Sequence, residues 1–249
     1  MKNHHKPTLR TLSILELISA GDLEYTLSNI SRSLGIPTST LFPILQTLLE
    51  EKYLGLDKNT QTYSLGTRLF EIGSRVQNSL VYKEISAIMN EVVAACGETC
   101  HFAMLDRGEV FFLVTVDSPN PVRMHCAIGR RMPAYSTAVG KALLRGRSLE
   151  ELRALYPEGL KPLTAHTVTD FETLHAQANG SDIFFYESEE STESICCIAV
   201  PIYRQGNVVA ASSVAMPVFR YDEEKKAITE NALKESLIRY EQVIHPFTF

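Results

Sequence analysis

The sequence lacks an apolar run long enough to cross a membrane. A membrane-spanning helix needs roughly 20 consecutive apolar residues, and polar or charged residues interrupt every apolar stretch of the 249-residue chain well before that length. Residues 1–10 are polar, and no apolar run that would make a signal peptide follows them. Both absences predict a cytoplasmic protein without membrane contact.

Cysteine is also scarce. The five cysteines are Cys96, Cys100, Cys126, Cys196 and Cys197. An odd number in a chain of this length fits reduced thiols better than a disulfide framework. The sequence also has no G-x-S-x-G, H-E-x-x-H or phosphate-binding loop, so none of these catalytic motifs favours an enzyme.

Positive charge is in short supply for a protein that binds nucleic acid. The chain carries 24 Lys and Arg against 29 Asp and Glu, a net charge of −5. Residues 1–75 hold 8 of the basic and 7 of the acidic side chains, or +1, which leaves 16 against 22, or −6, for the rest. Any DNA contact is therefore expected in the N-terminal part, with modest non-specific affinity unless dimerisation doubles the contacts.

The first 50 residues show three amphipathic helical patterns, within a chain whose length and 45% apolar content predict two domain cores. Apolar residues recur at helical spacing in each pattern: Leu9, Leu12, Leu15, Ile18; Leu27, Ile30, Leu34; and Leu41, Ile44, Leu45, Leu48, Leu49. Thr26 is a suitable N-cap for the second helix, and Gly35 suits the left-handed turn that ends it. Two short helices joined by such a turn are typical of a helix-turn-helix, whose second helix enters the DNA major groove.

The exposed side of the third helix would supply the DNA contacts. It carries Phe42, which can touch a thymine methyl group, and Gln46, which can pair with adenine. At the start of the helix, the hydroxyl groups of Thr38, Ser39 and Thr40 can bond phosphates.

Residues 53–65 predict two short strands around a turn, which is the arrangement of a wing. The turn Asp57-Lys58-Asn59-Thr60 offers Lys58 to the phosphate backbone. A compact protein-docking module is the alternative interpretation of residues 8–65, because a fold does not fix its function.

From residue 68 onward, a helical stripe is followed by mixed strands and helices. Leu69, Ile72, Val76 and Leu80 form the stripe of a helix at 68–80, which packs either on a second copy of the chain or on its own domain. Helices are then expected at 82–95, 138–144, 148–155, 170–178 and 222–243, and strands at 99–105, 110–116, 121–127, 183–186, 195–201 and 208–215. This mixture predicts an α+β domain.

Several motifs resemble one family of regulators. Residues 30–48, ISRSLGIPTSTLFPILQTL, and the later Tyr-Ser-Leu-Gly at 63–66 resemble the helix-turn-helix and wing of IclR-type transcription regulators. Segments of the second half are similar to the family's GAF-like effector domain: 97–99, 128–133, 138–142, 197–201 and 208–214.

The resemblance implies an organisation and a function. It implies a winged helix-turn-helix domain at 1–66, a linker helix at 67–80 and an effector-binding domain at 81–249. It further implies a homodimer or tetramer that binds operator DNA and a small organic acid, as a repressor or an activator. Neither enzymatic activity nor a cofactor is expected.

The resemblance also implies an effector site. By motif matching, the backbone donors for an acidic group fall on Ala138 and Val139, which begin a predicted helix. The remaining matched positions are the polar Glu187, Cys197 and Ser213 and the apolar Met124, Met132 and Ile195. A small hydroxy acid or sugar acid suits such a set.

Three of these residues also have an ordinary structural explanation. Buried cysteines such as Cys197 are usually small core residues, and Ser213 can simply bond a strand backbone. Without the resemblance, the acidic run around Glu187 would be interpreted as a solvated loop.

The sequence departs from the family pattern at three places. Ala215 stands where the family has a second strand serine, and residues 194–197, Ser-Ile-Cys-Cys, replace Gly-x-Arg-Cys. On the recognition helix, Pro43 stands where the family commonly carries a basic residue. Because proline cannot donate to the carbonyl of Ser39, it should kink or loosen the helix, so family base contacts are not transferred to that position.

Two other functions stay open on the residues alone. Cys96, Cys100 and His101 have the spacing of a partial metal or thiol-redox sensor, one ligand short of a structural zinc site unless Cys126 joins them. Cys197 or Cys100 with His101 is the candidate nucleophile and base of a cysteine-dependent enzyme.

Overall fold

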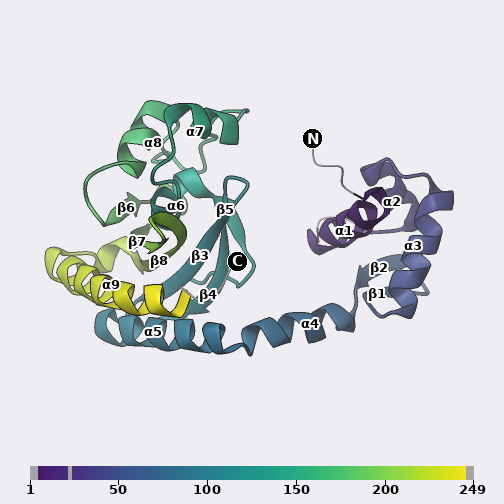
Figure 1. Ribbon diagram of the computed structural model, residues 1–249, viewed down its shortest axis with the longest axis horizontal. Helices are drawn as coiled ribbons and strands as arrows, with labels where there is room; N and C mark the ends of the chain where they lie inside the picture. Colours follow the sequence, from purple (N-terminus) through teal and green to yellow (C-terminus); the bar gives the residue numbers. More distant parts are fainter. Residues whose placement is uncertain (1–4, 22–23, 245–249) are drawn as a thin grey trace. The chain divides into compact units, whose positions relative to one another are not determined.

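The computed structural model describes residues 5–21 and 24–244, and the chain divides into two compact units, Met1–Ser79 and Leu80–Phe249. Figure 1 shows the elements of both units. Each unit encloses its own apolar core, as the length and apolar content predict. In the stretches of chain that the structure describes, no helix combines the length and apolar character that a membrane crossing requires.

The first unit is a winged helix-turn-helix, which confirms the predicted fold. Its elements are α1 (Lys6–Ser19), α2 (Leu27–Leu34), α3 (Thr38–Glu50), β1 (Leu54–Asp57) and β2 (Thr62–Leu65). Thr26 caps α2 by accepting the N–H of Asn29 at 3.3 Å, and Gly35 ends it with a left-handed φ of 62°. Each element contributes to the core, which contains Ile14, Ile18, Ile30, Leu41, Leu45, Leu48, Leu54 and Tyr63.

Pro43 lies inside α3 without ending it. The helix runs from Thr38 to Glu50, and the carbonyl of Pro43 accepts the hydroxyl of Thr47 at 3.0 Å. Because proline has no N–H, the carbonyl of Ser39 lacks its usual donor four residues on. The expected bend of the helix at this point stays a prediction.

The wing is a two-stranded antiparallel ribbon in which Leu54 pairs with Leu65 and Asp57 with Thr62. Its turn is held by the Asp57 carboxylate, which accepts the N–H of Asn59 at 2.8 Å. The backbone N–H of Tyr63 donates to the carbonyl of Tyr25 at 2.9 Å, which joins β2 to the segment before α2. Lys58 therefore stands on an exposed, locally ordered turn.

The helix expected at 68–80 is shorter than predicted. The helix α4 spans Thr67–Gln77, and Leu80 begins the next helix, α5 (Leu80–Cys96). The break follows from Asn78, whose side chain donates to the carbonyl of Ser74 at 2.9 Å where the helix would otherwise continue. No residue of α4 is buried, and Ile72 and Val76 of its apolar stripe are exposed.

The second unit is built on one antiparallel sheet, which confirms the α+β class. Among the described residues, the strand order is β5-β4-β3-β8-β7-β6. The strands are β3 (Thr99–Asp106), β4 (Glu109–Val116), β5 (Arg131–Pro133), β6 (Phe185–Ser188), β7 (Ile195–Arg204) and β8 (Asn207–Pro217). The helices are α5, α6 (Ala138–Leu143), α7 (Leu149–Leu155), α8 (Phe171–Ala178) and α9 (Glu223–Ile244).

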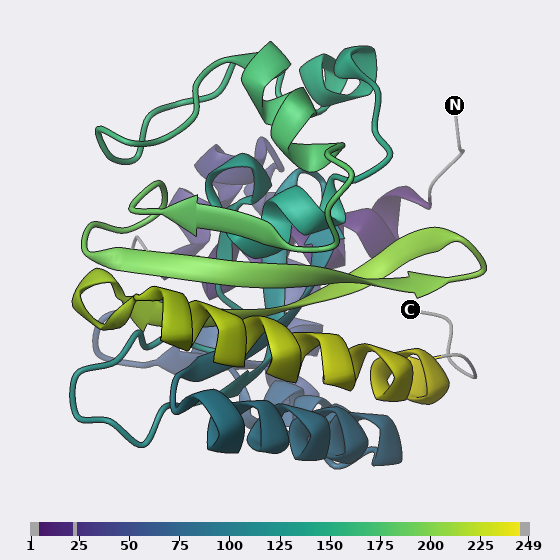
Figure 2. The same ribbon diagram turned by 90° about the vertical axis from the view of Figure 1, so that its left-hand side faces the viewer.

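The two faces of the sheet have different cover. Figure 2 shows α5 and α9 side by side along one face. Apolar residues of these helices pack there against Phe102, Val114, Ile198 and Val214. The other face lies against α6, with α7 and α8 beyond it, and holds a second core that includes Ala199 and Ala211.

Two strand predictions are wrong. Residues 121–127 form no strand. The carbonyl of Met124 accepts a hydrogen bond from the Thr99 hydroxyl at 3.0 Å, and the strand that pairs with the edge of β4 is formed by residues 131–133. The strand expected at 183–186 lies two residues later, because the Asp182 carboxylate accepts the N–H of Phe184 at 3.1 Å and turns the chain first. Glu187 thus belongs to a strand and not to a solvated loop.

Helix α6 sits unusually close to the turn that precedes it. A Cβ added at Gly140 would lie 2.1 Å from the carbonyl oxygen of Ala134, a distance that no real contact shows. The hydroxyl of Thr137 caps the helix by accepting the N–H of Gly140 at 3.0 Å. Glycine is therefore required for the position of α6 on the sheet.

We expect Gly140→Ala to destabilise the second unit by roughly 2–3 kcal/mol, because the backbone of α6 must move away from Ala134. Gly73→Ala is the matched control: Gly73 lies in exposed α4 with open space around it. That change should stabilise the chain by about 0.5–1 kcal/mol. Calorimetric unfolding of the full chain measures both, and shifts of equal sign and size would contradict the close contact.

Candidate functional sites

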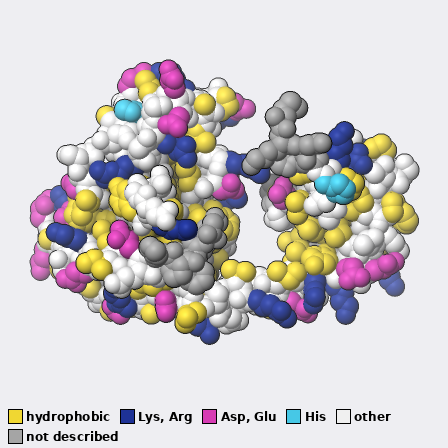
Figure 3. All heavy atoms as spheres, in the orientation of Figure 1, with side chains coloured by type: hydrophobic (Ala, Val, Ile, Leu, Met, Phe, Trp, Pro, Cys, Tyr) yellow, Lys and Arg dark blue, Asp and Glu magenta, His cyan; other side chains and the backbone are white. Residues whose placement is uncertain are grey.

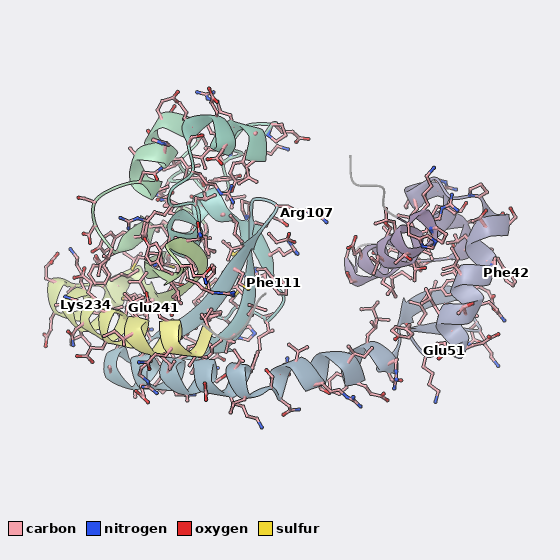
Figure 4. The ribbon with its side chains drawn as sticks, viewed as in Figure 1. Phe42, Glu51, Arg107, Phe111, Lys234 and Glu241 are labelled. Carbon is pink, nitrogen blue, oxygen red and sulfur yellow. The ribbon has the colours of Figure 1, made fainter. Side chains whose placement is uncertain are left out.

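The exposed side of α3 brings together the predicted DNA contacts of that helix. Thr38, Ser39, Phe42 and Gln46 are exposed, and Thr40 is half-buried. Phe42 keeps 52% of its surface in solvent, which is unusual for a phenylalanine, and Figure 4 shows it on the outward side of the helix. Leu41, Leu45 and Leu48 face the core instead and hold the helix in place. The arrangement presents hydroxyl, amide and aromatic groups on one ridge.

Lys58 comes from a different element of the same unit. It is exposed on the turn between β1 and β2. The structure adds two exposed polar side chains that the sequence pattern missed: Thr47 on α3 and Arg32 in the last turn of α2. Helical spacing from the exposed Pro43, four residues earlier, was the available signal for Thr47.

A cavity lies over the polar face of the sheet in the second unit. It measures about 370 Å³, counting the space open to solvent at its mouth. Seven of the eight predicted effector residues line it: Met124, Met132, Ala138, Val139, Ile195, Cys197 and Ser213. The lining also contains six residues that motif matching did not assign to the site: His101, Phe112, Cys126, Thr137, Ser191 and Ala215. Residues 121–127 thus help to enclose a cavity where a strand was expected.

Two rows of side chains cross the sheet on the face that holds the cavity, and four of their members line its floor: His101, Ser213, Ala215 and Cys197. One row runs through the paired residues Thr115, His101, Ser213, Ala199 and Phe185. The neighbouring row runs through Thr99, Ala215, Cys197 and Glu187. Since side chains two residues apart on a strand share a face, both rows point toward α6.

Glu187 lies behind Cys197 and not in the cavity lining. Its exposed fraction is 4%, and it borders a neighbouring hollow with Tyr186, Glu190 and Tyr221. One carboxylate oxygen accepts the N–H of Glu190 at 3.0 Å, and the other has no partner within the described part of the chain. Burial raises the pKa of Glu187 to about 7, although the Cys197 thiol and the N–H of Glu190 favour the ionised form.

A buried ion pair holds the loop after β6 against α6. The Nζ atom of Lys141 lies 2.5 Å from a carboxylate oxygen of Glu190, and both residues are buried. The backbone carbonyl of Glu190 also accepts the hydroxyl of Thr167 at 2.7 Å. This pair lies next to Ser191 at the cavity wall and engages the ammonium group of Lys141, whose charge also acts on Glu187.

The structure corrects the metal and thiol-redox alternative. Cys100 and His101 are neighbours on β3 and therefore project to opposite faces, Cys100 into the core under α5 and α9 and His101 into the cavity. Cys96 lies in the same core as Cys100. Among the residues that the structure describes, no three His, Cys, Asp or Glu side chains are placed to share a metal ion.

The cysteine nucleophile of the second alternative has an unfavourable environment. Burial raises the pKa of the Cys100 thiol to about 12. Burial and the neighbouring Glu187 carboxylate raise the pKa of Cys197 well above its ordinary value. Because the thiolate is the reactive form, neither thiol is activated for attack.

Two known domain families match the chain. The IclR helix-turn-helix domain matches residues 7–58. The family described as bacterial transcriptional regulator IclR C-terminal matches residues 74–237. The two matches together cover most of the sequence and correspond to the two units.

Curated relatives match over most of their own length. The HTH-type transcriptional regulator KdgR of Escherichia coli is 33% identical over 228 residues, which are 87% of this chain and 84% of that protein. The regulator of the same name from Dickeya chrysanthemi is 32% identical over 223 residues, with 88% and 73% covered.

Solved structures share the whole architecture. The IclR transcriptional regulator from Alicyclobacillus acidocaldarius has a TM-score of 0.84 and 25% identity, with 96% of this chain and 99% of that one covered. An IclR homologue from Microbacterium hydrocarbonoxydans in complex with 4-hydroxybenzoate has a TM-score of 0.75 and 24% identity, with 94% and 97% covered. The second likeness concerns the fold alone.

We expect Glu187→Gln to stabilise the chain at pH 8 but not at pH 5. The pKa of Glu187 is about 7 when folded against an ordinary 4.5, so the stability it contributes is full below pH 4.5 and is lost as the pH rises through 7. Glutamine cannot ionise, and the variant should gain roughly 3 kcal/mol over the native chain between these pH values. Denaturant unfolding at both pH values measures the gain.

The control is Glu193→Gln, which changes an exposed carboxylate in the loop that follows. It should shift stability by the same small amount at pH 5 and pH 8, because a solvated side chain makes little difference to folding. An equal response of the Glu187 and Glu193 variants would show that Glu187 does not ionise in a buried environment.

Proposed function

The chain belongs to the IclR family of bacterial transcriptional regulators, and from this premise we propose that it binds operator DNA through α3 and the wing while its second unit senses a small hydroxy acid. One observation carries the proposal. The same chain presents an exposed ridge on α3 and, in a separate unit, a largely apolar cavity into which His101, Cys197 and Ser213 bring polar groups. A change in operator affinity of about 1–3 kcal/mol on effector binding is typical of such coupling.

The proposed DNA contacts divide into base recognition and positioning. Gln46 would pair with adenine, and Phe42 would contact a thymine methyl group. Thr38, Ser39 and Thr40 at the start of α3 would bond phosphates, as would Lys58 on the wing. The proposed partner for these contacts is double-stranded operator DNA in the cytoplasm.

We propose that the active form contains two or four copies of the chain. In α4 and the first residue of α5, Phe70, Ile72, Val76 and Leu80 are between 45% and 79% exposed. Figure 3 shows hydrophobic side chains next to Lys and Arg along this helix. A second copy would cover the apolar stripe and would double the weak positive charge available to DNA. Half-sites would then lie near multiples of about 10 base pairs apart.

The proposed effector site is the cavity over the sheet. The carboxylate of the effector would meet the backbone N–H groups of Ala138 and Val139. The other oxygen atoms of the effector would meet Cys197 and Ser213. Met124, Met132 and Ile195 form the apolar wall, and Glu187 acts from behind Cys197. The regulator from Microbacterium hydrocarbonoxydans was solved with 4-hydroxybenzoate, and only the class of hydroxy acid is carried over to this chain.

Gln46→Ala should weaken binding to the native operator by roughly 1–3 kcal/mol and relax the preference at one base pair, because a bidentate contact to adenine is lost. Gln77→Ala, at the exposed end of α4, is the control and should change neither. Binding to operators with every base substituted in turn measures both effects. Unchanged affinity and base preference for Gln46→Ala would mean that another side of the helix faces the DNA.

Lys58→Ala should weaken binding to all duplexes about equally, because a phosphate contact carries no sequence information. The slope of log affinity against log salt should become shallower by about one for each wing that contacts DNA. Titrations at several salt concentrations measure the slope. An unchanged slope would remove the wing from the interface.

A further inference from the structure

His101 lines the cavity floor. It is 3% exposed, lies on the inner strand β3 and pairs with Ser213 on β8. Its Nδ1 atom is 3.2 Å from the hydroxyl of Thr115 on β4, and its ring meets that of Phe112 edge-on with centroids 5.2 Å apart. Neighbours on both sides therefore hold the imidazole in one orientation.

One nitrogen of this ring has no partner. Within the described part of the chain, Nδ1 bonds Thr115, and Nε2 makes no hydrogen bond. The hydroxyl of Ser213, on a residue that is 2% exposed, makes none there either. Both residues line the same cavity and stand side by side across the strand pair. In the described chain the fully buried atoms without a partner are carboxylate oxygens of Glu187 and Glu190, so Nε2 of His101 and the Ser213 hydroxyl are instead open to the cavity, where a ligand can bond them.

The charge around the floor selects the kind of group that fits it. Burial lowers the pKa of His101 to about 4, so the imidazole is neutral at physiological pH. None of the described lining residues is Lys or Arg, Lys141 is paired with Glu190, and Glu187 adds negative charge behind Cys197. A carboxylate would meet no cation here, whereas a hydroxyl group can donate or accept.

The charged groups that face His101 come from several segments. Asp117, His125 and Arg130 act on it through space from the segment after β4, and their effects on the pKa are smaller than that of burial. They do not change the neutral state of the ring. Either tautomer of His101 can bond a hydroxyl group, because a hydroxyl group complements both a donor and an acceptor.

We propose that His101 is a specificity-determining residue of the effector site and that, with Ser213, it binds a hydroxyl group of the effector through Nε2. The effector is then a hydroxy acid whose hydroxyl group faces the sheet and whose carboxylate faces away from Glu187. This inference rests on the proposed effector function. It assigns to His101 a role that motif matching did not predict.

Matched pairs of acids test the orientation. Binding of lactate and propanoate, 3-hydroxybutyrate and butyrate, and 4-hydroxybenzoate and benzoate to the full chain is measured by calorimetry at pH 7.5. The native chain should bind the hydroxy acid of at least one pair about 10- to 100-fold more tightly than the acid without the hydroxyl group, because the latter leaves buried polar groups unpaired. No preference in any pair would overturn the proposal.

Variants then assign the preference to His101. His101→Phe keeps an aromatic ring against Phe112 but has no nitrogen, so the ratio of the two affinities should fall to within about threefold of one. His101→Gln keeps a neutral donor and acceptor and should retain part of the affinity ratio. This variant also tests the role of His101 if His101→Phe does not fold. Met104→Leu changes a residue of the same strand that packs against the core under α5 and α9, outside the cavity lining, and should keep the full ratio. A ratio that survives in both His101 variants would make His101 a packing residue only.

Operator binding, measured in parallel, distinguishes a failure of the proposed role of His101 from a failure of the proposed regulatory function. A chain that binds operator and responds to a metabolite without a hydroxyl group would retain the proposed regulatory function and overturn the role of His101. A chain that ignores its operator, with or without these acids, would overturn the proposed function itself.

Discussion

The register between β3 and β8 is the constraint on which the second unit depends. Side chains alternate between the two faces of a strand, so one alignment assigns every residue of both strands to one of two environments. Phe102 and Val214 face the apolar helices α5 and α9, and His101 and Ser213 face the cavity. A slip of one residue would bury the imidazole under those helices. The apolar core therefore fixes the polar floor, although no cavity residue belongs to that core.

The polar face of this sheet carries charge where little water reaches it. Lys141 compensates Glu190, whereas Glu187 has one backbone donor and one oxygen without a partner among the described residues. A buried carboxylate in such surroundings holds its proton more strongly than one in water. The unit thus gains stability when Glu187 is neutral, and the ligand cavity lies directly in front of it. Stability of the fold and the proposed recognition of a ligand would therefore depend on neighbouring groups.

The first unit uses the same division between buried and exposed sides, and residues 1–75 carry a net charge of only +1, from 8 basic and 7 acidic side chains. α3 buries Leu41, Leu45 and Leu48 and carries neither lysine nor arginine, so its attraction to phosphates is weak. Specific contacts from Phe42 and Gln46 and the pairing of two units would have to supply the affinity. The exposed apolar stripe of α4 is suited to that pairing. A regulator whose single unit binds DNA weakly is one that a modest effector energy can switch.

Local patterns in the sequence determined the helices and the winged helix-turn-helix, because caps and helical periodicity act over a few residues. Thr26 and Gly35 mark the ends of α2, and the apolar stripe of α3 identifies its exposed side. The resemblance located seven cavity residues but not His101, and it did not show that Glu187 lies behind Cys197. The prediction of a strand at 121–127 was wrong, because apolar residues of this segment line a cavity instead of pairing in the sheet. Only the tertiary structure decided which side chains share the floor, since strand register joins residues such as His101 and Ser213 that are far apart along the chain.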